Sequence, residues 1–207
     1  MRVLIATDAQ VREVVAGSGL LDRLARGAVV CIASSASPDL CRALAEAAAR
    51  RGIGVLDTPV VLGQEAANDG TLTIYVGGAE AAFARAKPVL AAFGREVLYL
   101  GAAGNGQIAK TINNLLLWAC MTANFEALTL AKALGADVPR LVAALGQGSG
   151  ANWSLSRWGK GTGKWSEKDM DVALQLAQDA RVPVPLAGLV DQLVKQINQE
   201  KMKALLT

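Results

Sequence analysis

The sequence predicts an α/β half followed by an all-α half. Short apolar segments typical of buried strands alternate with helix-like segments as far as residue 100, a pattern typical of βαβ units and a mostly parallel sheet. No further strand-like segment follows Gly106, whereas helix-like segments continue almost to the last residue. Hydrophobic residues make up 52% of the 207-residue chain, which is enough to build a packed core.

In the α/β half, the expected strands are short and rich in small or β-branched residues. They cover residues 3–6, 28–33, 54–57, 72–76 and 96–100. The helices expected between them cover residues 8–15, 37–51 and 79–93. Asp8 is the expected cap of the first helix. The second has a strong start, because Ser37 is a favourable N-cap and Pro38 suits the first helical position.

In the all-α half, the expected helices cover residues 107–134, 139–145, 168–180 and 185–199. The first would be about 40 Å long at a rise of about 1.5 Å per residue, which is longer than a small domain needs. We therefore expect two domains that divide near residue 103.

Composition excludes several classes of function. Histidine is absent, which rules out Ser-His-Asp triads and His-containing zinc sites and leaves Lys, Tyr, Asp or Glu as acid/base groups. The net charge of +3 is too small to predict binding to nucleic acid or an anionic membrane. The three cysteines lack metal-ligand spacing, so we expect no metal site and a reducing compartment. No signal-peptide pattern or run of 18 apolar residues occurs, and we expect a cytoplasmic protein.

The main candidate motif is the stretch 101–114, GAAGNGQIAKTINN. A glycine-rich turn follows a strand and opens a helix, on which Lys110 and Asn114 are four residues apart and share one face. The segment after Asn114 is apolar all round, which indicates burial. Lys110, Asn113 and Asn114 would then form a polar site at the edge of a core. A solvated lysine at a helix start is the alternative.

Other conspicuous residues have structural interpretations. The turn reads G-x-x-G-x-G, not the dinucleotide fingerprint G-x-G-x-x-G, so a pyrophosphate site there is not expected. Asp57 is expected to cap or turn a strand end. The tryptophans at 153, 158 and 165 are expected to pack in the core or an interface, with a substrate pocket as the alternative.

Four motifs occur in the order of one known family: SSASP at 34–38, DTPV at 57–60 with GTL at 70–72 and VGG at 76–78, the stretch 101–114, and KDM at 168–170. With them the sequence resembles the β-hydroxyacid dehydrogenases, which include 3-hydroxyisobutyrate dehydrogenase and are related to 6-phosphogluconate dehydrogenase. The resemblance covers nearly the whole chain. It begins partway into the family's N-terminal domain, because no G-x-G-x-x-G unit precedes Val3.

The resemblance implies an NAD(P)-dependent oxidoreductase that transfers hydride between a nicotinamide and a hydroxy acid or aldehyde-like substrate. Residues 1–103 would form a partial, N-terminally truncated Rossmann-like NAD(P)-binding domain, and 104–207 an all-helical substrate and dimerisation domain. The implied roles are catalytic for Lys110 and Asn114, cofactor-binding for Ser34, Ser35 and Lys168, and substrate-binding for Val61, Leu62, Gly63 and Asn113. Either NAD or NADP would be compatible.

In the family's substrate-binding motif, Ser-Gly-Gly follows the segment that matches DTPV at 57–60. This chain has Val61, Leu62 and Gly63 there. A hydroxyl donor is replaced by an isopropyl group and a glycine by leucine. If the family's substrate pose holds, the pocket is more apolar and tighter, and a small hydroxy acid is not the expected substrate.

Two alternatives follow from the missing first βαβ unit. The chain could be a truncated relative that does not bind dinucleotide and acts as a dimerising or small-molecule-binding protein, or Met1 could be an internal start of a longer protein. An open sheet edge invites pairing with another chain. We therefore expect a homodimer or higher homo-oligomer, built on that edge or on the long helix.

Overall fold

The computed structural model describes residues 1–5, 7–161 and 163–207, and the chain forms two compact units, Met1–Lys110 and Thr111–Thr207. We call them the N-terminal and C-terminal units. The described strands all lie in the N-terminal unit: β1 (Arg2–Val3), β2 (Val29–Ile32), β3 (Gly54–Asp57), β4 (Val60–Val61), β5 (Leu72–Gly78) and β6 (Gly94–Tyr99). Its helices are α1 (Asp8–Arg12), continued by the π-helical turn Glu13–Gly17, α2 (Leu20–Arg23), α3 (Pro38–Ala49), α4 (Gly63–Asn68), α5 (Glu80–Leu90) and the start of α6 (Asn105–Ala133).

The described strands form one mixed sheet in the order β1-β2-β3-β5-β4, with β6 also paired to β5. Strands β1, β2 and β3 are parallel to one another, as are β5 and β6. Strand β5 runs antiparallel to both β3 and β4, and the Thr58–Pro59 connection joins β3 to β4. The expectation of a mostly parallel sheet is confirmed, with β3–β5 and β4–β5 as the antiparallel pairs.

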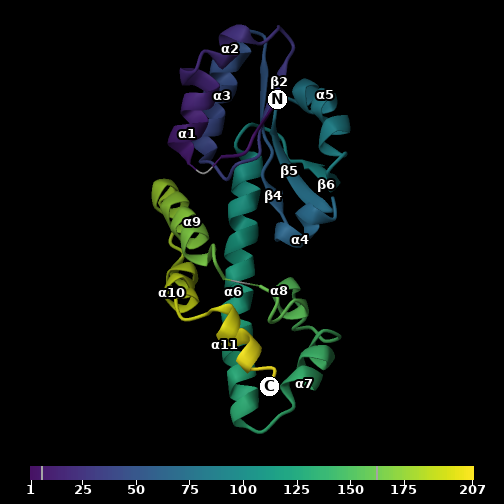
Figure 1. Cartoon of the computed structure of the whole chain (residues 1–207). Coiled ribbons are helices and arrows are strands. Elements are labelled where there is room, and N and C mark those ends of the chain that lie inside the picture. The colour runs from purple at the N-terminus through teal and green to yellow at the C-terminus, as the bar shows by residue number, and fades with distance from the viewer. Residues whose placement is uncertain (6, 162) are drawn as a thin grey trace. The chain divides into compact units, whose positions relative to one another are not determined.

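The sheet has a buried core on each face. Val30 and Ile32 pack in one core and Cys31, between them, packs in the other, as expected when successive strand residues point to opposite faces. Figure 1 shows α1 and α3 covering one face and α5 the other. Burial on both faces explains why these strands are continuous apolar runs without polar alternation.

Several expected boundaries differ from the observed ones. The first strand is Arg2–Val3 rather than 3–6, because the N–H of Ile5 donates to the Ser34 hydroxyl, at 2.8 Å, and leaves the ladder; Ala6 lies outside the described residues. Thr7, not Asp8, caps α1, and its hydroxyl accepts from the Gln10 N–H. The Ser37–Pro38 helix start is confirmed.

Sequence patterns missed the shortest elements. Strand β4 has two residues and is ordered by pairing of Val60 with Ile74, so no local pattern predicts it. The helix expected over 185–199 is two helices, because Asn198 adopts extended backbone and caps a new helix through the Lys201 N–H. The sequence patterns also do not predict α2, α4 or the short helix α8 (Trp153–Ser156).

The C-terminal unit is all-helical in its described residues. It contains the remainder of α6 with α7 (Val138–Leu145), α8 (Trp153–Ser156), α9 (Ser166–Ala180), α10 (Pro185–Val194) and α11 (Gln199–Ala204). Met170, Val190 and Met202, from α9, α10 and α11, pack in one core with Trp118 of α6. Two indole N–H groups join segments of the unit: Trp118 donates to Asp169 at 3.0 Å and Trp158 to the Met202 carbonyl at 3.1 Å. Among the described residues, no helix has the length and apolarity needed to cross a membrane.

Candidate active site around Lys110

Asp57 sits at the carboxyl end of β3 and caps the start of α6. Its side chain is 1% exposed, and its two oxygens accept the backbone N–H groups of Gly104, at 2.8 Å, and Gln107, at 3.0 Å. A carboxylate is favourable there because the first N–H groups of a helix have no partner within the helix and carry partial positive charge. Asp57 was expected to cap or turn a strand end; it does end β3, but its carboxylate caps the first turn of α6.

Backbone conformation and the Asp57 cap together explain why glycines stand at positions 101, 104 and 106 of the turn. Gly101 and Gly104 have φ angles of +89° and +91°, which favour glycine. A Cβ on Gly106 would lie 2.7 Å from an Asp57 carboxylate oxygen and 2.9 Å from the Tyr75 carbonyl oxygen. Because a protein carboxylate already occupies the N–H groups of Gly104 and Gln107, these amides do not form a pyrophosphate cradle.

Gln107 is a buried residue of the site that sequence reasoning missed. It is 2% exposed; its amide nitrogen donates to the Ser34 carbonyl at 2.7 Å and its amide oxygen accepts from the Ala36 N–H at 3.2 Å. The signal in the sequence was a long amide in the first turn of a helix expected to be buried, but its partners are more than 70 positions away.

The Ser34–Ala36 loop follows β2 and is held from two sides. Ser34 is 1% exposed, and its hydroxyl accepts the Ile5 N–H from the segment after β1. Ser35, by contrast, is exposed. The loop thus lies at the carboxyl edge of the parallel strands, the edge at which open α/β sheets bind ligands.

Lys110 is half-buried, and its ammonium donates to the Val60 carbonyl on β4 at 2.8 Å. A long flexible side chain held on a backbone oxygen differs from the solvated charge that was the alternative interpretation. The contact places the ammonium beside the connection that runs from Asp57 into β4.

The turn after β4 is backbone-strained. Val61 is 4% exposed, whereas Leu62 is half-buried and has φ +81°, a left-handed conformation that disfavours leucine. Gly63 follows with φ +75° and opens α4. Since consecutive Cα atoms are about 3.8 Å apart, the Leu62 Cα lies within about 8 Å of the Val60 Cα. Leu62 therefore belongs to the neighbourhood of the lysine.

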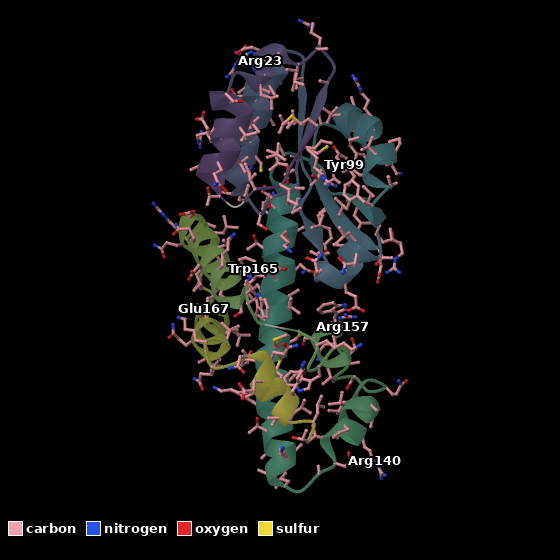
Figure 2. The ribbon with its side chains drawn as sticks, in the orientation of Figure 1. Arg23, Tyr99, Arg140, Arg157, Trp165 and Glu167 are labelled. Carbon is pink, nitrogen blue, oxygen red and sulfur yellow. The ribbon has the colours of Figure 1, made fainter. Side chains whose placement is uncertain are left out.

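The remaining predicted site residues belong to the C-terminal unit. Asn114 is 6% exposed, and its side-chain oxygen accepts from the Asn113 amide at 3.1 Å. Asn114 lies one turn beyond Lys110 on the continuous helix α6. Lys168 is exposed, with its ammonium 5.9 Å from the ring centroid of Trp165, which Figure 2 labels.

The tryptophans of this unit divide into two kinds. Trp158 is in the core at 7% exposure, as expected. Trp153 and Trp165 are 45% and 57% exposed, so they do not pack in the core, and an interface or a substrate pocket remains the prediction for them. Arg157 lies over the Trp153 ring, 5.3 Å from its centroid, and Lys164 lies 5.0 Å from that of Trp165, so each indole is covered by a cation.

Comparisons with known proteins match both halves of the chain. A family model described as the NAD binding domain of 6-phosphogluconate dehydrogenase matches residues 1–101. A second, described as NAD-binding of NADP-dependent 3-hydroxyisobutyrate dehydrogenase, matches residues 104–205.

Individual relatives agree with the family models. A 3-hydroxyisobutyrate dehydrogenase from Pseudomonas aeruginosa is 36% identical over 192 residues, which cover 84% of this chain and 64% of that protein. An uncharacterized oxidoreductase from Shewanella frigidimarina is 30% identical over 208 residues, covering 95% of this chain and 72% of that protein. The crystal structure of 3-hydroxyisobutyrate dehydrogenase from Salmonella typhimurium has a TM-score of 0.78 at 27% identity, and the match covers 94% of this chain and 72% of that one.

The chain thus spans 64% of the length of the Pseudomonas relative. The match to the Shewanella protein covers 95% of this chain and 72% of that protein. Together with the two family models and the shared fold, these matches show that the chain belongs to the β-hydroxyacid dehydrogenase family, the family of 3-hydroxyisobutyrate dehydrogenase.

Proposed function

We propose that this chain is an NAD(P)-dependent oxidoreductase that interconverts a hydroxy acid and an aldehyde-like product, with Lys110 as its catalytic group. The proposal rests on the Lys110 ammonium, which donates to the Val60 carbonyl at 2.8 Å. This contact lies near the carboxyl ends of the parallel strands, the edge at which open α/β sheets bind ligands, and the chain belongs to a family of dehydrogenases.

Lys110 supplies the polar chemistry of the reaction. Its ammonium can donate a hydrogen bond to the substrate oxygen and stabilise negative charge that develops there. As a neutral amine it can accept the proton that a hydroxyl releases. The Val60 carbonyl accepts a hydrogen bond from this ammonium and orients the side chain. Asn113 and Asn114 are proposed to orient the substrate, since their amides lie within one turn of Lys110 on α6.

The residues fit a nicotinamide cofactor in part. The loop with Ser34 and Ser35 lies at the appropriate sheet edge, and Lys168 is an exposed cation available to a phosphate; these residues are proposed to hold the cofactor. The turn at 101–106 is not proposed to do so, because Asp57 occupies its amides. When bound, the nicotinamide supplies or accepts the hydride.

The substrate is proposed to contact Val61, Leu62 and Gly63. Val61 offers an isopropyl group instead of a hydroxyl, and Leu62 adds a bulky apolar group at a glycine-like conformation. The substrate therefore presents an apolar group to this turn, and not a second carboxylate or hydroxyl.

Residues 1–103 are assigned to cofactor binding and 104–207 to substrate binding and dimerisation. A homo-oligomer is supported by exposed apolar residues on and before α10, among them Val182, Leu186 and Leu189, which are 54%, 66% and 56% exposed. A monomeric mass by light scattering at micromolar concentration would contradict this assignment. A cytoplasmic location is supported by free, buried thiols at Cys31 and Cys41.

The test begins with a fluorescence titration of the protein with NADH and NADPH, followed by turnover assays with branched hydroxy acids and aldehydes. Lys110→Met should abolish turnover and leave the melting temperature within a few degrees. Lys132→Met is the matched control, because Lys132 also lies on α6 and donates to a backbone carbonyl, that of Ala204 at 2.6 Å. Normal turnover in Lys110→Met would refute the catalytic role.

The titration also tests the alternative of a dimerising or small-molecule-binding protein. Absence of NADH and NADPH binding up to millimolar concentration would favour that alternative for this chain. It is less favoured at present, because the named relatives that match across both halves are dehydrogenases.

A further inference from the structure

One connected set of buried and partly buried hydrogen bonds joins the carboxyl ends of three neighbouring strands to the helix that carries Lys110. After β1, the Ile5 N–H donates to the Ser34 hydroxyl. After β2, the Ser34 carbonyl and the Ala36 N–H bond to the Gln107 side chain. At the end of β3, Asp57 accepts from the first turn of α6. All these contacts lie within the N-terminal unit.

The Gln107 side chain spans the Ser34–Ala36 loop with both ends of its amide. A donor at 2.7 Å and an acceptor at 3.2 Å on one planar group fix the loop in position and in orientation. An apolar residue of the same length would fill the space but would leave a buried carbonyl and a buried N–H without this partner, which is costly in a site excluded from water.

The backbone of the same residue is fixed independently by Asp57, through its N–H. Lys110 follows less than one helical turn later, and its ammonium returns to Val60, a short distance along the chain from Asp57. Asp57 and Val60, three residues apart, therefore both bond to α6, the first through the Gln107 N–H and the second through the Lys110 ammonium. The Gln107 side chain attaches the Ser34–Ala36 loop to the same helix.

We propose that Gln107 is a positioning residue, which holds the Ser34–Ala36 loop in register with the first turn of α6 and thereby sets the Lys110 amine relative to that loop. The inference rests on the proposed function for its kinetic consequence, since Ser34 and Ser35 are the proposed cofactor contacts. Its structural content, the coupling of the loop to the Lys110 side chain, does not depend on turnover.

The test compares Gln107→Met with Asn124→Leu. Methionine keeps the length of glutamine and removes its hydrogen bonds to the Ser34 carbonyl and the Ala36 N–H. Asn124 is a matched control, because it is a 9%-exposed amide on the same helix that bonds to Asn152 and Ser154 at 2.9 and 2.8 Å. It lies about 21 Å farther along α6 than Lys110, at about 1.5 Å per residue. Both variants should melt at lower temperature than the original protein.

Three readouts separate positioning from a general loss of stability. In Gln107→Met, exchange of the Ala36 amide proton should accelerate, and acetylation of Lys110 by acetic anhydride should rise several-fold relative to Lys132, measured by mass spectrometry. The value of kcat/KM should fall roughly 100-fold, the loss typical of a misplacement near 1 Å. In Asn124→Leu all three should stay within about twofold of the original protein, because the Asn124 amide bonds to Asn152 and Ser154 and is remote from the Ser34–Ala36 loop.

Unchanged Lys110 acetylation or Ala36 exchange in Gln107→Met would overturn the proposal, whether or not the protein turns over NAD(P)H. A kcat/KM within a few-fold of the original would also overturn it, since the loop would then not position the amine. If the original protein shows no turnover while both labelling readouts respond as expected, the coupling stands and the proposed function fails.

Discussion

The two units use buried polar groups differently. In the N-terminal unit, Asp57 and Gln107 bond to backbone groups from loops far apart in the chain and hold those loops at one sheet edge. In the C-terminal unit, Asn124 bonds to the side chains of Asn152 and Ser154 and joins α6 to the start of α8. The first arrangement positions a site, whereas the second adds specificity to helix packing.

The two units can be followed separately by fluorescence. The four tryptophans lie at positions 118 to 165 in the C-terminal unit, and the two tyrosines, Tyr75 and Tyr99, lie on β5 and β6 of the N-terminal unit. Tyr99 and Trp165 are labelled in Figure 2. Tryptophan fluorescence, excited selectively, therefore reports the unfolding of the C-terminal unit. Tyrosine fluorescence reports the unfolding of the N-terminal unit.

The largest losses of stability are expected for Asp57→Ala in the N-terminal unit and Asn124→Ala in the C-terminal unit. Asp57 accepts two backbone N–H groups as a charged acceptor, and such bonds contribute about 1.5–3 kcal/mol each, so its loss should cost about 4 kcal/mol. The Asn124 side chain makes three neutral hydrogen bonds, which contribute about 1 kcal/mol each, so Asn124→Ala should cost about 3 kcal/mol.

Denaturant unfolding should show Asp57→Ala mainly in the tyrosine signal and Asn124→Ala mainly in the tryptophan signal. Asp39→Ala is the control, because that carboxylate is 86% exposed and should change stability by less than about 0.5 kcal/mol. If both signals shift equally in every variant, the units unfold together and the comparison fails.

A second pair of substitutions should have opposite signs. Gly106→Ala brings a Cβ within 3.0 Å of Asp57 and Tyr75 oxygens and should destabilise by about 2 kcal/mol through overpacking. Gly188 lies inside α10, and a methyl group added there would meet nothing within 4 Å, so Gly188→Ala should stabilise by about 0.5–1 kcal/mol. Thermal melts of both variants check this, and a stabilised Gly106→Ala would refute the close approach of Asp57.

Alkaline pH should weaken the N-terminal unit. Burial, then the negative charges of Asp57 and Asp8, raises the pKa of Cys41 above its usual 9.0. The contribution of this thiol to the free energy of unfolding is therefore constant below pH 9. Above pH 9 the thiol ionises more readily in the unfolded chain, so the contribution falls with rising pH until the raised pKa of the folded state is reached. The slope is about 1.4 kcal/mol per pH unit.

Urea unfolding of the original protein and Cys41→Val at several pH values above 9 measures this effect. The variant should show a shallower decline in stability, whatever its stability at neutral pH. Equal slopes would mean that the thiol does not contribute to the pH dependence.

The smallest effects concern the two described non-glycine residues with positive φ, Leu62 at +81° and Arg181 at +56°. Glycine at either position relieves backbone strain, and each substitution should stabilise by up to about 1 kcal/mol. Only Leu62→Gly should also change the ranking of substrates by size, because only Leu62 adjoins the strand that holds Lys110. Unchanged substrate ranking would remove Leu62 from the proposed pocket.

Local sequence determined most of the secondary structure. The apolar runs of β2 and β3, the Ser37–Pro38 helix start and the position of Lys110 and Asn114 on one helix follow from side-chain periodicity and capping, which act over a few residues. The family resemblance likewise depended on motifs readable in order along the chain.

The tertiary structure alone decided how the site is built. The partners of Asp57, Gln107 and Lys110 lie 47 to 73 positions away along the chain, and no local pattern encodes them. The spacing of the glycines already argued against a phosphate loop, but only the structure shows what they accommodate, the Asp57 carboxylate that lies against Gly104 and Gly106. The reason is physical: a buried polar group must find a partner, and which partner it finds depends on how distant segments cross.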